Sequence, residues 1–419
     1  EWGWEPRGRG GTRRGWAAVR SPARTGAGRR RHAGSGTESR NRMLRHRGRC
    51  GDVPQASGKD AGGAARTGTF PTACTVGERL REVRTTVARS THEERIMKTD
   101  VVRQPLMAAF ATLFVFAVAA MAHAGASGVP EPHDPLLPEA LIMQWRTAWP
   151  RFSMLLAGAA IFCSGVILGR QAMRYALYPV STFITMPLFG LLAAGLLSGP
   201  AFLTEYAVCL LLVLSLRNYY ASFRNGAYGF GEIFRASLYL GAIPLIHAPG
   251  LLLVLFMPAA LAIFKRSTRE QIVAVTGFLL PFAAWSYGVW VAGGDIAGPA
   301  VVLWREFTAH GVCPIVHAAP AALVLPGLTL LLGVCGVCCY AADRYSVGSK
   351  SRAILLLNTV LFALTVVMGL LPCQASPVDA LTAVPAAVLL PLVFVRLNRL
   401  AALLLYALLV AALVAPLFF

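Results

Sequence analysis

Long apolar blocks separated by short polar connections make up the chain from residue 97 to its end. The first block extends from Leu106 to Ala122. Ten further blocks follow, over residues 152–169, 177–199, 201–216, 227–246, 249–264, 271–292, 319–341, 353–372, 377–395 and 400–418. Most of them approach the roughly 20 residues that an α-helix needs to cross a bilayer. The pattern predicts an all-α fold, a polytopic transmembrane helical bundle of about 11 spans.

One stretch decides the predicted topology, because residues 233–264 are too long for a single span. As one helix, these roughly 32 residues would extend about 48 Å, well beyond a hydrocarbon core of about 30 Å. A break at Ala248-Pro249-Gly250 interrupts the stretch. We therefore predict two spans that turn at His247. Glu232 and Arg235 then lie at the inner headgroups and can pair on one helix face, because they are three positions apart.

The charged connections predict the orientation of the spans. Thirteen basic residues fall on alternate connections, namely Arg170, Arg174, Arg217, Arg224, Arg235, Lys265, Arg266, Arg269, Arg344, Lys350, Arg352, Arg396 and Arg399. The opposite connections hold three basic residues, Arg146, Arg151 and Arg305, against seven acidic ones. Cytoplasmic loops carry an excess of Lys and Arg. We therefore expect a bacterial inner (plasma) membrane protein with a cytoplasmic amino terminus and a periplasmic carboxyl terminus.

The first apolar block has two interpretations. Ala122-His123-Ala124 has the small-x-small pattern of a signal-peptide cleavage site, and cleavage would leave about 10 spans. An uncleaved first span fits as well and is preferred, because further spans follow directly. In both cases the chain emerges outside. Residues 125–151 then form a first external loop, and residues 293–318 form a second long one.

Composition supports a membrane protein and separates residues 1–96 from the rest. Only 14% of the 419 residues are charged and the mean hydropathy is +0.57, whereas soluble domains carry about 25% charged residues. Residues 1–96 hold 21 Lys and Arg against 9 Asp and Glu, so this segment carries +12 of the net charge of +19. It is rich in Arg and Gly and has no apolar periodicity, so we predict that it is disordered.

Two origins are open for this basic tail. Met97 begins a sequence that reads like a bacterial amino terminus, so residues 1–96 are best interpreted as upstream sequence translated from a mis-set start, or as an artefact. The alternative is a basic tail for nucleic acid or anionic lipid, indicated by Arg7-Gly8-Arg9-Gly10 and Arg29-Arg30-Arg31. Interleaved aromatic residues are confined to three tryptophans, which form no stacking platform. No nucleic-acid partner is therefore predicted.

Several short motifs between Trp149 and Asp295 follow one another in a distinctive order. They are Arg217-Asn218-Tyr219-Tyr220, Phe223, Phe230-Gly231, Leu238-Tyr239-Leu240-Gly241, His247-Ala248-Pro249-Gly250, Arg269-Glu270 and Gly277-Phe278-Leu279-Leu280-Pro281. This order resembles an uncharacterised family, a domain of unknown function, of multi-pass inner-membrane proteins from Gram-negative bacteria. More distantly, the chain is similar to multi-spanning glycosyltransferases that use polyprenyl-phosphate sugars. The first resemblance implies a topology and a membrane, and the second implies an activity.

Candidate chemistry gathers on the external side. Glu131 and Asp134 flank His133 in the first external loop, and a carboxylate there can act as the general base that deprotonates an acceptor hydroxyl. The phosphate of a lipid leaving group would need a nearby cation, for which His247 and Arg305 are the candidates. The alternative interpretation is an ordinary solvated polar loop.

Metal and cofactor sites are not predicted. No pair of histidines has the i,i+4 spacing of metal ligands, and the chain has no Gly-rich phosphate loop or nucleotide fingerprint. Cys335, Cys338 and Cys339 share a helix face without a fourth ligand, so they are interpreted as small core residues. Cys313 and Cys373 both lie in external connections and could form a disulfide in an oxidising periplasm.

Three functions are open at this point. The most specific is a lipid-linked glycosyltransferase-like enzyme with an external site, whose partner is membrane lipid or a lipid-linked substrate. The second is a transporter with a site at the membrane midplane, indicated by prolines inside the spans. The third is a non-catalytic membrane assembly subunit. The enzyme is preferred, because titratable residues concentrate outside rather than at mid-membrane.

Overall fold

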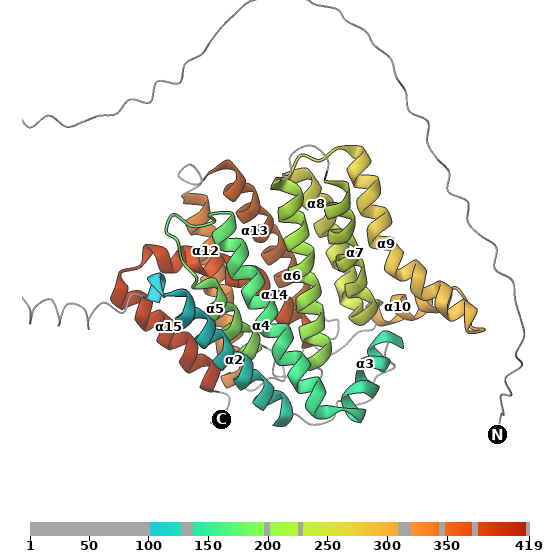
Figure 1. Ribbon diagram of the computed structural model, residues 1–419, viewed down its shortest axis with the longest axis horizontal. Helices are drawn as coiled ribbons and strands as arrows, with labels where there is room; N and C mark the ends of the chain where they lie inside the picture. The colour runs from blue at the N-terminus through green and yellow to red at the C-terminus, as the bar shows by residue number, and fades with distance from the viewer. Residues whose placement is uncertain are drawn as a thin grey trace, which may run out of the picture. The chain divides into compact units, whose positions relative to one another are not determined.

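The computed structural model describes residues 101–415, apart from six gaps at residues 127–136, 197–201, 225–228, 309–319, 343–347 and 371–375. Within the described residues there are thirteen α-helices, two 3₁₀ helices and no strand (Figure 1). The predicted all-α fold is therefore confirmed for this part of the chain. The basic tail of residues 1–96 lies outside it.

Among the described residues, five helices are long and apolar enough to cross a membrane by length and composition. They are α4 (Pro150–Arg174), α6 (Phe202–Arg224), α9 (Thr268–Val291), α12 (Pro320–Ala342) and α13 (Ser349–Leu370). Shorter apolar stretches lie in α2 (Leu106–Ala126), α5 (Thr185–Leu196), η2 (Ala248–Leu255) with α8 (Phe256–Ile263), α14 (Ser376–Arg396) and α15 (Arg399–Val414). The remaining elements are η1 (Val101–Arg103), α3 (Leu137–Ala148), α7 (Phe230–Ile246) and α10 (Gly298–Thr308). Apolar helices of this kind are those expected of a membrane protein, while the total of about 11 spans stays a prediction.

The predicted break near His247 is present in the structure. α7 ends at Ile246, His247 has an extended backbone (φ −144°, ψ 104°), and η2 follows directly. Pro249 has no N–H with which to continue the helical hydrogen bonds. Gly250 lets the chain fold back closely, since a Cβ there would lie 2.6 Å from Cγ2 of Ile243. η2 then continues as a 3₁₀ helix of eight residues that leads into α8.

The helix predicted from residue 177 begins later, at Thr185. Pro179 disfavours the helical conformation in the residue before it, and residues 177–184 form an irregular connection. Tyr178 in this connection is buried, and its hydroxyl donates a hydrogen bond of 2.8 Å to the backbone carbonyl of Val388 on α14. The apolar pattern at the start of this block therefore reflects burial and not a helix.

α6 continues about two turns beyond its predicted end. The added turns carry Tyr219 and Tyr220, which are both buried. The amide of Asn358 on α13 donates a hydrogen bond of 2.6 Å to the hydroxyl of Tyr220, and the hydroxyl of Tyr219 lies 3.1 Å from that of Ser237 on α7. Arg217 therefore marks a charge on the exposed side of α6 and not the end of the helix.

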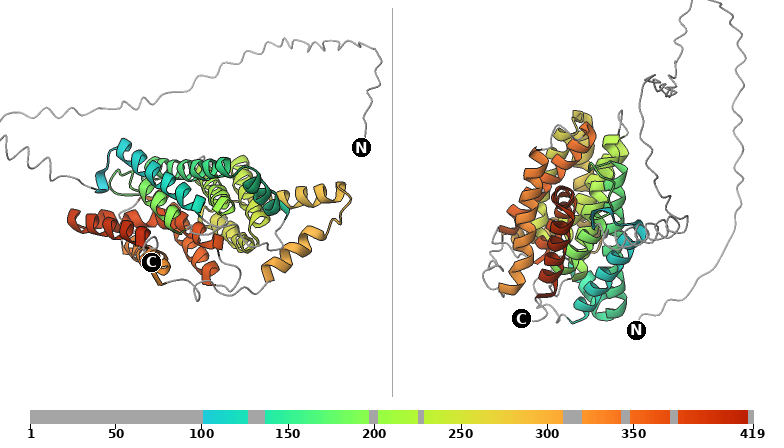
Figure 2. Two further views of the ribbon diagram at one scale, coloured as in Figure 1. Left: turned by 90° about the horizontal axis from the view of Figure 1, so that it is seen from below. Right: turned by 90° about the vertical axis from the view of Figure 1, so that its left-hand side faces the viewer.

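α6 is also the centre of the packing. It lies against α4, α7 and α14, and α14 in turn packs on α5, α12 and α13. α2 covers α4 and α5, whereas α9 packs mainly on α7. Figure 2 shows α9 and α10 reaching away from the other helices. Much of α9 is consequently exposed, including Leu279, Tyr287 and Trp290.

Two glycines allow close contact between α7 and α9. A Cβ at Gly277 would lie 2.7 Å from the backbone oxygen of Phe234, and a Cβ at Gly241 would overlap the backbone carbonyl of Phe278. Small residues of this kind let helix backbones approach closely in membrane bundles. α9 is thus held along one strip by backbone-to-backbone packing.

Hydrogen bonds also bring the basic helix ends together. Arg266, between α8 and α9, donates a hydrogen bond to the backbone carbonyl of Ser222 near the end of α6. The hydroxyl of Ser351 at the start of α13 donates to the carbonyl of Tyr175 just after α4 (2.8 Å), and Arg396 at the end of α14 donates to a backbone carbonyl of α12 (3.2 Å). We call this the basic end. Its exposed basic side chains are Arg170, Arg174, Arg217, Arg224, Arg235, Lys265, Arg269, Lys350, Arg396 and Arg399.

Candidate functional site

α3 and α10 both pack on the hairpin of α7 and η2, at the end of the bundle opposite the basic end (Figure 1). α3 packs on α4, α6 and α7, and α10 packs on α9 and η2. Both therefore contact the hairpin of α7 and η2 that turns at His247. Ala248 lies in one apolar cluster with Leu303 and Val302 of α10 and Phe282 of α9. We call α3, the His247 turn and α10 the outer segments.

His247 is buried in its turn, with 8% of its surface exposed. Its backbone N–H donates to the carbonyl of Ile243 (2.9 Å), and its carbonyl accepts from the N–H of Gly250 (2.9 Å). Nε2 of the ring has no hydrogen-bond partner among the described residues. Burial lowers the pKa of His247 from its ordinary value of 6.5 to about 3, because the imidazolium would lose its hydration. The ring is therefore neutral at physiological pH, and Nε2 can donate or accept one hydrogen bond according to its tautomer.

Arg305 lies on the exposed side of α10. This helix is amphipathic, with Pro299 and Leu303 buried, while 59% of the Arg305 side chain is exposed. Its guanidinium lies 3.7 Å from the carboxylate of Glu306, and an exposed pair of this kind is weak. The guanidinium is therefore accessible to a phosphate at the outer segments.

The predicted general bases lie outside the described residues. Glu131 and Asp134 belong to residues 127–136, which directly precede α3 in the sequence. α3, which follows these two residues in the sequence, packs on α7, and α10, which carries Arg305, packs on η2. The structure describes the side chains of His247 and Arg305, the first buried and the second exposed.

A charge pair links α3 to α6. This pair was not predicted from the sequence. Glu205, in the first turn of α6, is completely buried, and Arg146, in the last turn of α3, is half-buried. Burial lowers the pKa of Arg146, and the negative charge of Glu205 acts in the opposite direction, so the two groups interact. The available signal was a single acidic residue at the start of an otherwise apolar helix, since such residues need a partner.

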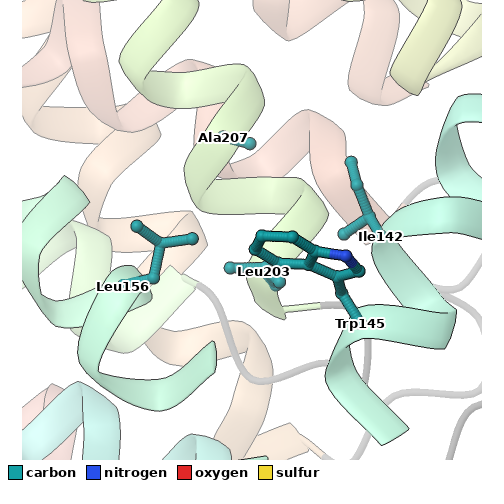
Figure 3. Close-up of a pocket in the computed structure, with 5 residues that line it drawn as sticks. All are labelled: Ile142, Trp145, Leu156, Leu203 and Ala207. Carbon is teal, nitrogen blue, oxygen red and sulfur yellow. The ribbon is translucent and has the colours of Figure 1, made fainter. Parts of the chain in front are cut away.

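An apolar pocket of about 280 Å³ lies between the same two helices and α4. Its walls come from three helices: Ile142 and Trp145 of α3, Leu156 of α4, and Leu203 and Ala207 of α6 (Figure 3). The indole of Trp145 lies close to Leu203, with Leu156 on the opposite side of the pocket. No spacing within one segment predicts such a pocket, because each helix supplies only one or two of its residues.

Among the described residues, no group of three or more His, Cys, Asp or Glu side chains is placed to hold a metal ion. Cys335, Cys338 and Cys339 are free thiols on α12, and the first two are exposed. Their interpretation as core residues is therefore wrong for Cys335 and Cys338, because α12 is covered on one side only. Cys313 and Cys373, whose disulfide was considered above, lie outside the described residues.

Comparisons of the chain with protein-family models, with curated proteins and with solved structures found no match. Both resemblances drawn from the sequence therefore stay predictions. The outer segments offer a neutral buried imidazole and an accessible guanidinium, and Glu131 and Asp134 precede α3 in the sequence.

Proposed function

We propose that this chain is a multi-pass protein of a bacterial inner membrane, with about 11 spans. The spans are α2, α4, α5, α6, α7, η2 with α8, α9, α12, α13, α14 and α15. Exposed Lys and Arg side chains gather at the basic end, so this end faces the cytoplasm. The amino terminus is then cytoplasmic, the carboxyl terminus is periplasmic, and the outer segments face the periplasm.

The activity that fits this arrangement is sugar transfer from a polyprenyl-phosphate donor, as in the lipid-linked glycosyltransferases that the chain resembles. The observation that carries it is the packing of α3 on α7 and of α10 on η2, the two arms of the hairpin that turns at His247. These segments follow or carry the residues with suitable chemistry. A site at their junction would lie where a lipid phosphate at the membrane surface and a hydroxyl acceptor in the periplasm can meet.

Asp134 or Glu131 acts as the general base of this reaction. The carboxylate takes the proton of an acceptor hydroxyl while the hydroxyl oxygen forms a bond to the anomeric carbon of the sugar. The bond from that carbon to the phosphate oxygen breaks, and polyprenyl phosphate leaves with the electron pair. Arg305 and the neutral imidazole of His247 donate hydrogen bonds to the phosphate oxygens and stabilise the charge that develops there.

Loss of labelled sugar from a lipid-extractable donor tests the proposal. The full-length protein is placed in nanodiscs with polyprenyl-phosphate hexoses labelled in the sugar, and with membrane glycolipids and water as acceptors. Replacing both carboxylates, Glu131→Gln with Asp134→Asn, is expected to lower the rate about 10²–10⁴-fold, the usual contribution of a general base. Glu139→Gln, in the same external stretch, is the matched control and should keep the wild-type rate.

Two results would overturn parts of this proposal. An unchanged rate in the double variant would exclude these carboxylates as the base. No release of sugar from any donor by the wild-type protein would exclude sugar transfer itself.

A transporter is the second candidate, because η2 is an eight-residue 3₁₀ helix inside an apolar segment. Runs of 3₁₀ helix this long are uncommon and often mark functional hinges, and interrupted spans form substrate sites near the midplane of transporters. Uptake of labelled solutes by proteoliposomes, combined with no sugar release in the assay above, would favour this candidate over the enzyme.

A further inference from the structure

We propose that the pocket beneath Trp145 binds one hydrocarbon chain of an anionic phospholipid from the periplasmic leaflet, with the lipid phosphate at Arg146 and Arg151. The inference rests on the proposed membrane arrangement, but it does not rest on sugar transfer. It assigns a ligand to a cavity that the proposed reaction leaves unused, since neither His247 nor Arg305 lines it.

The lining of the pocket favours a hydrocarbon chain over water. Four of the five lining side chains are pure hydrocarbon, and the indole N–H of Trp145 is the one polar group among the five (Figure 3), whereas a water molecule in a cavity needs about two to four polar partners. The volume of about 280 Å³ is close to the lower limit, about 300 Å³, of pockets that hold small ligands. Part of a single lipid chain is an apolar group that fits this space.

The pocket is continuous with a surface that faces lipid in the proposed arrangement. Leu156, which forms one wall, is 42% exposed, and its neighbours Phe152 and Leu155 on α4 are more exposed still. A chain can therefore enter from the bilayer without crossing the packed interior. Trp145 and Trp149 are also exposed, and tryptophan is enriched at the headgroup level of membrane proteins. The pocket therefore opens just below the headgroups.

The charges beside the pocket favour an anionic headgroup. The rings of Trp145 and Phe152 are in edge contact, with centroids 6.2 Å apart, so the end of α3 lies against the first turn of α4. Arg146 follows Trp145 and Arg151 precedes Phe152, so the turns of α3 and α4 that form this corner also carry the two arginines. Glu205 offsets the charge of Arg146, and Arg151, which is exposed, adds a second positive charge. Arginine binds phosphate oxygens with two parallel hydrogen bonds.

Quenching of Trp145 by brominated lipids tests the site in the full-length protein. The protein is reconstituted into phosphatidylcholine vesicles that contain a minor fraction of phosphatidylglycerol brominated on its acyl chains. In matched vesicles the phosphatidylcholine carries the bromine. Because the chain has eight tryptophans, the Trp145 signal is taken as the difference between wild type and Trp145→Phe. Phosphatidylglycerol is expected to quench at an about fivefold lower mole fraction than phosphatidylcholine, and Arg151→Gln is expected to remove this preference.

A filled pocket provides the second arm of the experiment. Ala207→Phe is expected to abolish the saturable quenching, whereas Ala283→Phe, on the exposed face of α9, is the matched control and should leave it intact. Where Ala207→Phe does not yield folded protein, the wild type is tested by competition between unbrominated and brominated phosphatidylglycerol. A decrease in quenching on addition of the unbrominated lipid shows that the site is saturable.

The outcomes separate the lipid site from the proposed reaction. Equal quenching in Ala207→Phe and wild type, or no competition by the unbrominated lipid, overturns the pocket as the site. Equal quenching by the two phospholipids overturns the anionic headgroup. Quenching by a brominated polyprenyl phosphate in place of phosphatidylglycerol shows that the occupant is a lipid-linked substrate, and the phospholipid assignment is then wrong. Each outcome is measured without sugar transfer.

Discussion

Gly241 and Gly277 are the residues that attach α9 to its neighbour. Only 22% of the most apolar part of α9 is buried inside the protein. This is the lowest share among the five long apolar helices of the described chain. Its main neighbour is α7, and there the two glycines place backbone against backbone. The attachment therefore depends on the absence of side-chain atoms at two positions, and a small substitution is enough to disturb it.

Gly241→Val is expected to destabilise the protein by about 1–3 kcal/mol, as overpacking of a packed position does. The added side chain would overlap the carbonyl of Phe278, which belongs to the backbone and cannot rotate away. Heating in detergent followed by size-exclusion chromatography measures the effect as a lower temperature at which monodisperse protein is lost. Gly288→Ala, also on α9, is the control, because nothing lies within 4 Å of a Cβ there. Equal midpoints for Gly241→Val and wild type would show that α7 and α9 separate without cost.

The carboxylate of Glu270 stabilises the connection between α8 and α9. Glu270 is buried. Its Oε1 accepts hydrogen bonds from Arg266 (3.2 Å) and from the N–H of Gly229 (3.3 Å), and its Oε2 accepts from the N–H (3.0 Å) and the hydroxyl (3.1 Å) of Ser267. Ser267 and Glu270 also form a capping box that begins α9. Glu270 therefore ties the start of α9 to the start of α7.

Glu270→Ala is expected to cost about 3–5 kcal/mol, because breaking a buried ion pair leaves the charge of Arg266 and the N–H of Gly229 without their partner. Hydrogen exchange of the first turns of α7 and α9 measures the local effect. Glu306→Gln is the control, since 59% of the side chain of its partner Arg305 is exposed and ion pairs at the surface contribute about 0–1 kcal/mol. Unchanged protection in both turns of Glu270→Ala would contradict the role of this joint.

Local signals explain which elements could be predicted from the sequence. Pro249 and Gly250 in succession favour the end of an α-helix through the local sequence alone, so the break after α7 was predictable. The irregular connection before α5 was not, because Tyr178 is held by a carbonyl 210 positions away in the chain. The pairing of Arg146 with Glu205, and the pocket between their helices and α4, require three helices to meet. Segments are therefore predicted well from apolar patterns, whereas contacts between segments are not.

The two ends of the described bundle differ in charge. The basic end exposes ten Lys and Arg side chains, whereas the outer segments carry charges of both signs, such as Arg305 and Glu306. In the proposed arrangement, this difference sets the direction in which the protein crosses the membrane.

Labelling of single cysteines in intact cells tests that direction. In a variant without native cysteines, Asp295→Cys after α9 is expected to react with a membrane-impermeant maleimide, while Lys265→Cys after α8 is expected to react only after the cells are opened. Both positions are exposed in the structure, so neither is shielded by the fold itself. The reverse pattern would mean an inverted protein, and equal labelling of both would mean that α9 does not span.

The 3₁₀ winding of η2 affects how thick a membrane this segment can cross. A 3₁₀ helix rises about 2.0 Å per residue, against about 1.5 Å in an α-helix. Eight residues of η2 and eight of α8 therefore reach about 28 Å, where the same residues in a continuous α-helix would reach about 24 Å. The hydrocarbon core of a typical bilayer is about 30 Å thick. A short segment thus covers nearly the full thickness by being wound more tightly over half its length, and rewinding that half as α-helix would adapt it to a thinner bilayer.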